Sequence, residues 1–131
     1  MRRLAAFAAL AVLLAGCGGK AAAPTPNGQA PAPAEGNAAA GKVVFMSSGC
    51  AGCHTFAPAG TTATIGPNLD HLAAYAKKAN ESLADFTRSA ITNPPAAYVP
   101  PGFKNVMPTN FDVSLTSGQL ADVVAFLTRG A

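Results

Sequence analysis

The sequence is poor in the residues that build large cores and charged surfaces. Its 131 residues include no Trp, two Tyr and only 11% charged side chains. So little charge excludes the clustered basic patch of a nucleic-acid-binding protein. No alternating run of apolar and polar residues indicates a strand. No paired carboxylates, Ser–His–Asp set or phosphate-binding glycine loop is present, so we expect no enzymatic site. The length indicates one domain with accessory segments.

No hydrophobic run is long enough to cross a membrane. Residues 4–14 are apolar, but a transmembrane helix needs roughly 20 such residues. A short apolar run that follows Arg2 and Arg3 is typical of a secretory signal. Without these two arginines, seven cations face six anions, so we expect a mature chain close to neutral.

The three cysteines lie at positions 17, 50 and 53. The first ends the run Leu14-Ala15-Gly16-Cys17, which resembles the lipobox of bacterial lipoproteins. The resemblance implies a signal peptide over residues 1–16 and a lipid on Cys17; ordinary secretion with a free cysteine is the alternative. Several acyl chains give lasting membrane attachment. We expect the protein at the periplasmic face of the cytoplasmic membrane, with the outer membrane as a second possibility.

Residues 17–37 are rich in Pro, Ala and Gly and have almost no large apolar side chain. Such a segment cannot bury enough surface to offset the entropy lost on ordering, and its prolines favour extended conformations. We expect a lipid-anchored, disordered tether here, which leaves residues 38–131 as the folded domain.

The folded part has the pattern of an all-α protein with about three to five short helices. We expect one helix over 38–48 with Asn37 as N-cap, and two short helices within 69–91, the second begun by Ser82 and Asp85. The last helix follows a capping box of Thr116 and Gln119. Between residues 93 and 114, five prolines predict a long loop without regular structure. A loop of that length inside a small domain is normally functional.

The strongest motif is Cys50-Ala51-Gly52-Cys53-His54. A C-x-x-C-H run in an exported protein is the attachment signature of c-type haem. Each thiol can add to a haem vinyl group, and the adjacent imidazole can bind the iron. A thioredoxin-type pair, a structural zinc site and a simple disulfide are the competing interpretations. The first lacks a βαβ pattern, the second lacks further ligands, and the third leaves His54 without a role.

A six-coordinate haem iron needs a second axial ligand, for which the mature chain offers Met46, His71 and Met107. Met46 is one helical turn before Cys50 and cannot reach the opposite face of the haem. His71 lies among residues that appear helical and is more typical of a solvated position. Met107 lies in the long proline-rich loop, far enough along the chain to close over the distal face. We therefore expect His54 and Met107 to bind the iron, with His71 as the alternative.

The folded part resembles a class I monohaem cytochrome c along its whole length. Four features occur in the family's order: Gly41 and Phe45 where the first helix crosses the last at Val123 and Phe126, Cys50-Ala51-Gly52-Cys53-His54, Gly66-Pro67-Asn68-Leu69, and Met107-Pro108. The resemblance implies a small helical bundle around one haem. It also implies that the Pro67 carbonyl accepts the proximal imidazole N–H, that Leu69 packs on the haem and that Met107 is the distal ligand.

The function that this resemblance implies is single-electron transfer in a respiratory or photosynthetic chain, by a monomer that is not an enzyme. Its partners would be redox proteins, including membrane respiratory complexes. Tyr75 and Tyr98 could bond a haem propionate, with core or loop packing as the alternative. Few lysines surround the motif, so we expect a brief, largely apolar encounter with weak salt dependence. A haem-bearing subunit of a membrane oxidase or reductase, and a haem peroxidase or gas sensor with a labile distal ligand, are the alternatives.

Overall fold

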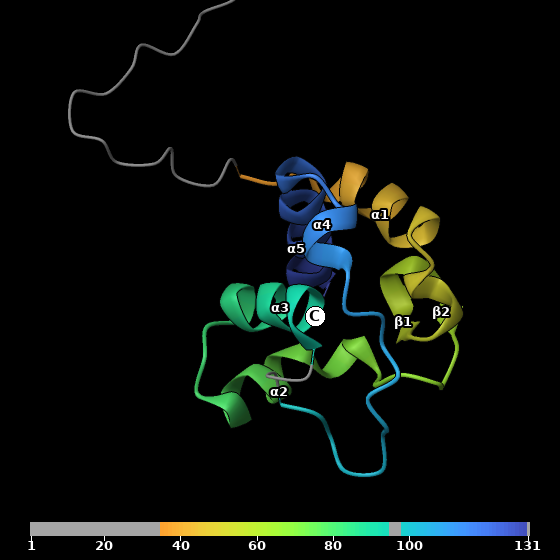
Figure 1. Ribbon diagram of the computed structural model, residues 1–131, viewed down its shortest axis with the longest axis vertical. Coiled ribbons are helices and arrows are strands. Elements are labelled where there is room, and N and C mark those ends of the chain that lie inside the picture. The colour runs from red at the N-terminus through yellow and green to blue at the C-terminus, as the bar shows by residue number, and fades with distance from the viewer. Residues whose placement is uncertain (1–34, 95–97, 131) are drawn as a thin grey trace, which may run out of the picture. The chain divides into compact units, whose positions relative to one another are not determined.

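Within residues 35–94 and 98–130, which the computed structural model describes, helices predominate (Figure 1). The α-helices are α1 (Ala38–Ser47), α2 (Leu72–Ala79), α3 (Leu83–Thr92), α4 (Phe111–Ser114) and α5 (Ser117–Gly130). Three short 3-10 helices, η1 (Cys50–Gly52), η2 (Ala57–Ala59) and η3 (Leu69–His71), connect them. The predicted all-α class with three to five short helices is confirmed.

The predicted helix starts are confirmed by their hydrogen bonds. The Asn37 side chain accepts from the backbone N–H groups of residues 39 and 40 at 2.9 and 3.2 Å. The Ser82 hydroxyl accepts from the backbone N–H of Asp85 at 3.1 Å. Thr116 and Gln119 form a reciprocal capping box, with bonds of 2.9 and 3.2 Å. Each cap satisfies backbone donors that the first turn of a helix leaves unpaired.

Two predictions about irregular structure were wrong. The sequence shows no alternating run, yet Thr55–Phe56 (β1) and Thr61–Thr62 (β2) pair as a short antiparallel hairpin. Strands of two residues are too short to produce an apolar–polar period. The loop expected over residues 93–114 is also not entirely irregular, because α4 occupies its last turn.

The longest-range packing joins α1 to α5, which lie side by side in Figure 1. Gly41 of α1 lies so close to α5 that a Cβ would overlap the Asp122 carbonyl oxygen and come within 2.7 Å of the Phe126 Cβ. This close approach brings the rings of Phe45, Phe56 and Phe126 together, with centroids 5.3 to 5.9 Å apart. Edge-to-face and tilted aromatic packing of this kind is favourable. The predicted crossing of the first and last helices is therefore confirmed.

The residues directly before α1 also contact α5. The backbone N–H of Asn37 donates to the Asp122 carboxylate at 2.7 Å. A Cβ at Gly36 would overlap the carbonyl of Ala121. Gly36 and Asn37, which the sequence analysis placed at the end of the tether, therefore contact α5. The predicted signal peptide, Cys17 and the rest of the tether up to residue 34 lie outside the described residues. Among the helices that are described, none has the length and hydrophobicity needed to span a bilayer.

Substitution Gly41→Ala should lower the free energy of unfolding by about 1–3 kcal/mol, the usual cost of overpacking a tight contact. The added methyl group has no room between α1 and α5. Chemical denaturation of the haem-loaded protein would measure the change. Gly118→Ala is the control, because a Cβ there would meet nothing closer than the Thr116 hydroxyl oxygen at 4.0 Å. Equal stability of the two variants would contradict the close helix contact.

Candidate cofactor site

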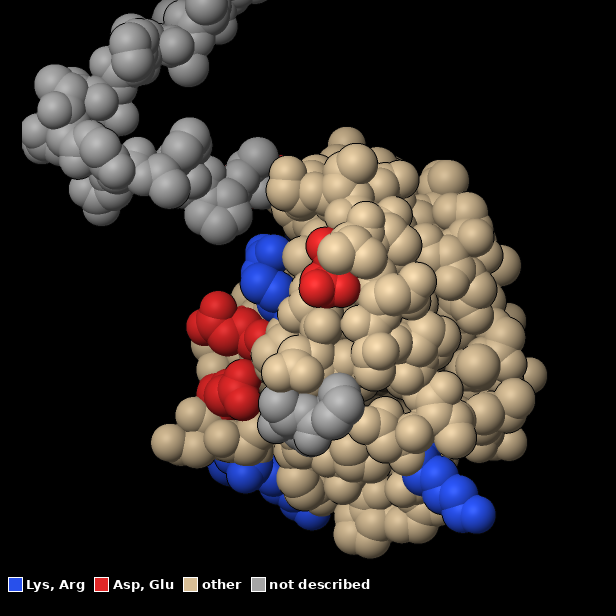
Figure 2. All heavy atoms as spheres, in the orientation of Figure 1, with Lys and Arg blue, Asp and Glu red and all other residues tan. Residues whose placement is uncertain are grey.

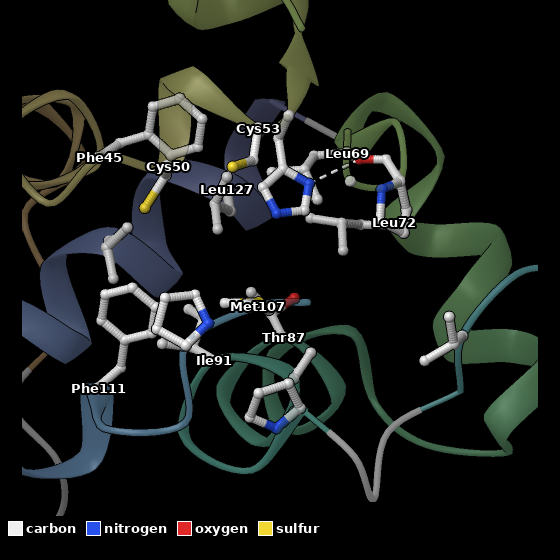
Figure 3. Close-up of a pocket in the computed structure, with 18 of the residues that line it drawn as sticks. Phe45, Cys50, Cys53, Leu69, Leu72, Thr87, Ile91, Met107, Phe111 and Leu127 are labelled. Carbon is white, nitrogen blue, oxygen red and sulfur yellow. Dashed lines mark hydrogen bonds between the residues drawn. The ribbon is translucent and has the colours of Figure 1, made fainter. Parts of the chain in front are cut away.

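A mostly apolar cavity occupies the middle of the domain, between the Cys50–His54 segment and the loop that precedes α4 (Figure 3). Its volume is about 310 Å³, within the range of roughly 300–1,000 Å³ that is typical of ligand sites. The aliphatic and aromatic lining residues from the helices include Val44, Phe45, Leu72, Phe86, Ile91 and Leu127.

The residues of the sequence motif line one side of this cavity. Cys50 and Cys53 are half-buried, both sulfurs are free thiols, and η1 brings them onto neighbouring positions of one turn. In Figure 3 both side chains lie on the same side of the cavity as Leu69. Burial raises the pKa of the Cys50 thiol above its ordinary value. The thiol pair therefore faces an apolar space, as attachment to an apolar macrocycle requires.

His54 is buried against the cavity, and one of its ring nitrogens is already engaged. Nδ1 lies 2.7 Å from the Pro67 carbonyl oxygen, which can only accept a hydrogen bond. Nδ1 must therefore hold the proton and donate. Burial lowers the pKa of His54, which favours the neutral ring. In a neutral imidazole protonated at Nδ1, Nε2 has a free lone pair, the form in which histidine binds a metal.

Met107 lies on the other side of the cavity. Figure 3 shows it with Ile91 and Phe111, across from Cys53 and Leu69. Its side chain is half-buried, and Pro108 follows it in the loop. The other two ligand candidates lie elsewhere: His71 is exposed, the side chain of Met46 is 50% exposed, and neither lines the cavity.

Two tyrosines border the cavity together. The rings of Tyr75 and Tyr98 lie 6.1 Å apart at an angle of 40°, and the Lys78 ammonium lies 5.7 Å from the Tyr98 ring centroid. Burial, with a smaller contribution from Tyr98, raises the pKa of Tyr75. The Tyr75 hydroxyl therefore remains a protonated donor at neutral pH. Lys104 and Asn105 add further polar groups to the lining.

Sequence reasoning missed two residues at the site. Thr87 is buried in the cavity lining, and its hydroxyl donates to the Leu83 carbonyl at 2.7 Å. A threonine satisfied within its own helix can occupy an apolar face, and its spacing of four from Leu83 and Ile91 was the available signal. Gly66 was included in a motif, but its contact with the His54 ring has no signature in the sequence.

The donor set of the cavity fits a c-type haem. It combines two thiols in C-x-x-C spacing, a neutral imidazole with a free nitrogen, a thioether and a wall of aliphatic and aromatic side chains. The described residues contain no group of three His, Cys, Asp or Glu side chains that could hold a metal ion. The structure therefore does not support the competing zinc interpretation.

The fold and this donor set define a small helical haem protein of the electron-transfer type. The family model for cytochrome c matches residues 38–130, most of the chain. The chain belongs to the cytochrome c family and is a haem-based electron carrier with a covalently bound c-type haem. Comparison with curated proteins gave no significant match.

Proposed function

We propose that the protein is a class I monohaem cytochrome c that shuttles single electrons in a respiratory or photosynthetic chain. The observation that supports this best is the placement of His54 and Met107 on the lining of one apolar cavity. Cys50 and Cys53 would hold the haem covalently, and His54 and Met107 would be its axial ligands. Bound there, the haem supplies a one-electron couple.

The residues around the haem would let it change oxidation state with little rearrangement of its surroundings. The Pro67 carbonyl holds the His54 ring by its Nδ1–H, and Leu69 also lines the cavity. The apolar walls exclude water, which keeps the environment of the haem fixed in both oxidation states. A thioether ligand favours the reduced state and raises the potential. Tyr98, and Tyr75 beside it, supply hydroxyl donors for a haem propionate.

The mouth of the cavity supports a docking mode that depends little on charge. Ile65 and Val106 line the cavity, yet their side chains are 59% and 62% exposed. Figure 2 shows that charged side chains cover little of the face it presents and gather mainly along its left edge. We propose that donor and acceptor proteins meet this apolar rim in brief encounters, because apolar contacts are little affected by salt.

The N-terminal segment supports attachment to a membrane. Its short apolar run ends in a cysteine, and a Pro/Ala-rich stretch separates that cysteine from α1. We propose a lipid on Cys17, a flexible tether that begins at residue 17 and ends before Gly36, and a location on the periplasmic side of the cytoplasmic membrane. A tether of this length lets the haem domain move between partners while it stays at the surface.

Substitution Met107→Ala should remove the weak long-wavelength Met–iron band of the ferric protein. It should also lower the midpoint potential, on the order of 100 mV, a modest part of the ~0.8 V that axial ligands span. Optical redox titration of the haem-loaded protein would measure both changes. Met46→Ala is the control, because that side chain is exposed and does not line the cavity. A high-spin spectrum of the wild-type protein would favour a peroxidase or gas sensor instead. Loss of the low-spin spectrum in His71→Ala would assign the second ligand to His71.

Replacing Ile65 or Val106 with Ser should slow the oxidation of the ferrous protein by respiratory membranes about fivefold, which corresponds to the loss of about 1 kcal/mol of apolar contact. Stopped-flow spectrophotometry at low and high ionic strength would measure the second-order rate. The rate should change little with salt. Val113→Ser is the matched control, because Val113 is 80% exposed but does not line the cavity. A steep fall of the wild-type rate with salt would overturn the apolar docking mode.

Substitution Cys17→Ser should move the protein from the membrane fraction to the soluble periplasmic fraction without changing its haem content. The lipid would be lost, whereas the thiols at positions 50 and 53 would remain available to the haem. Cell fractionation with haem staining of denaturing gels would show both results. A variant that stays in the membrane fraction would contradict lipid anchoring and favour a fixed subunit of a membrane complex.

A further inference from the structure

Gly66 lies directly against the imidazole of His54. A Cβ at residue 66 would come within 2.5 Å of the ring Cε1, 2.8 Å of Nδ1 and 3.0 Å of Nε2. Contacts below 3.0 Å are essentially never seen for real Cβ atoms. The described glycines with a positive backbone φ angle are at residues 49, 60 and 102, so residue 66 lies outside the left-handed region that favours glycine. The need for glycine here comes from the ring and not from the backbone.

The segment that contains Gly66 is held on both sides and cannot easily move away from the ring. The Gly66 backbone N–H donates to the Cys53 carbonyl at 2.7 Å. The next residue, Pro67, accepts the His54 Nδ1–H at 2.7 Å. A methyl group at residue 66 would therefore force one of these two bonds to lengthen. The bond to the imidazole is the more easily broken, because a side chain can rotate about χ1 and χ2 while the backbone stays in place.

We propose that Gly66 is a positioning residue for His54, which fixes the plane of the imidazole and keeps its Nδ1–H on the Pro67 carbonyl. The proposal rests on the proposed function, since it gives His54 the role of proximal ligand. A hydrogen bond on the outer nitrogen of a metal-binding histidine sets its orientation and its basicity. The absence of a side chain at Gly66 thus becomes part of what defines the haem environment.

A substitution at Gly41 serves as a control that distinguishes a positioning role of Gly66 from ordinary packing. A methyl group there is crowded just as severely, but by the backbone of α5 and the Cβ of Phe126, and Gly41 does not line the cavity. Gly118 lies in the first turn of α5 and has open space. The three glycines therefore provide a site variant, a crowded variant away from the site and an uncrowded variant.

The experiment compares the full haem-loaded wild-type chain with Gly66→Ala, Gly41→Ala and Gly118→Ala. The measurements are the ferric EPR g-values, the midpoint potential, the exchange rate of the His54 Nδ1 proton by NMR and the stability to denaturant. In Gly66→Ala the g-values and the potential should shift, and the proton should exchange about tenfold faster, the scale of one lost hydrogen bond. Gly41→Ala should lose stability but keep the wild-type g-values, potential and exchange rate.

The opposite results would overturn the proposal. A Gly66→Ala protein that loses stability but keeps the wild-type g-values and exchange rate would assign Gly66 to packing alone. If Gly66→Ala yields no haem-loaded protein while Gly41→Ala does, the defect is specific to the His54 contact and supports the proposal. Failure of both variants to yield haem-loaded protein would count against the proposal. A wild-type spectrum without imidazole ligation would instead refute the proposed function, and the two failures are therefore distinguishable.

Discussion

The contact between α1 and α5 supports the rest of the structure, because it carries much of the buried core that lies against the cofactor cavity. The buried aromatic cluster of Phe45, Phe56 and Phe126 lies where these helices meet. A domain of this size has a small core, and a cofactor bound in the adjoining cavity would add apolar contacts to it. The absence of a side chain at Gly41 makes the helix contact possible.

The site shows how few polar groups are needed to define a haem environment. The buried imidazole is oriented by one backbone carbonyl, and the buried Thr87 hydroxyl is satisfied within its own helix. Within the described residues, no buried side-chain nitrogen or oxygen lacks a hydrogen-bond partner. The cavity therefore has an apolar lining with a small number of fixed hydrogen-bonding groups. Such a lining suits a cofactor that must change charge with little rearrangement.

The elements that the sequence predicted well are those with local signals. The capping side chains of Asn37, Ser82 and Thr116 bond to residues two or three positions away, so their patterns are visible in the chain. The C-x-x-C-H motif likewise defines its chemistry within five residues. The hairpin, Thr87 and the contact of Gly66 with His54 were missed, because they depend on tertiary neighbours that no short window contains. The lipid anchor and the tether remain predictions from the sequence.

The bond between Asn37 and Asp122 joins residues that are 85 positions apart, which has a consequence for the order in which the protein matures. Loops of this length close slowly, and the contact cannot form until the last helix has been synthesised. The segment over residues 50–54 lies inside that loop. Both thiols therefore stay accessible in the open chain until the first and last helices pack together.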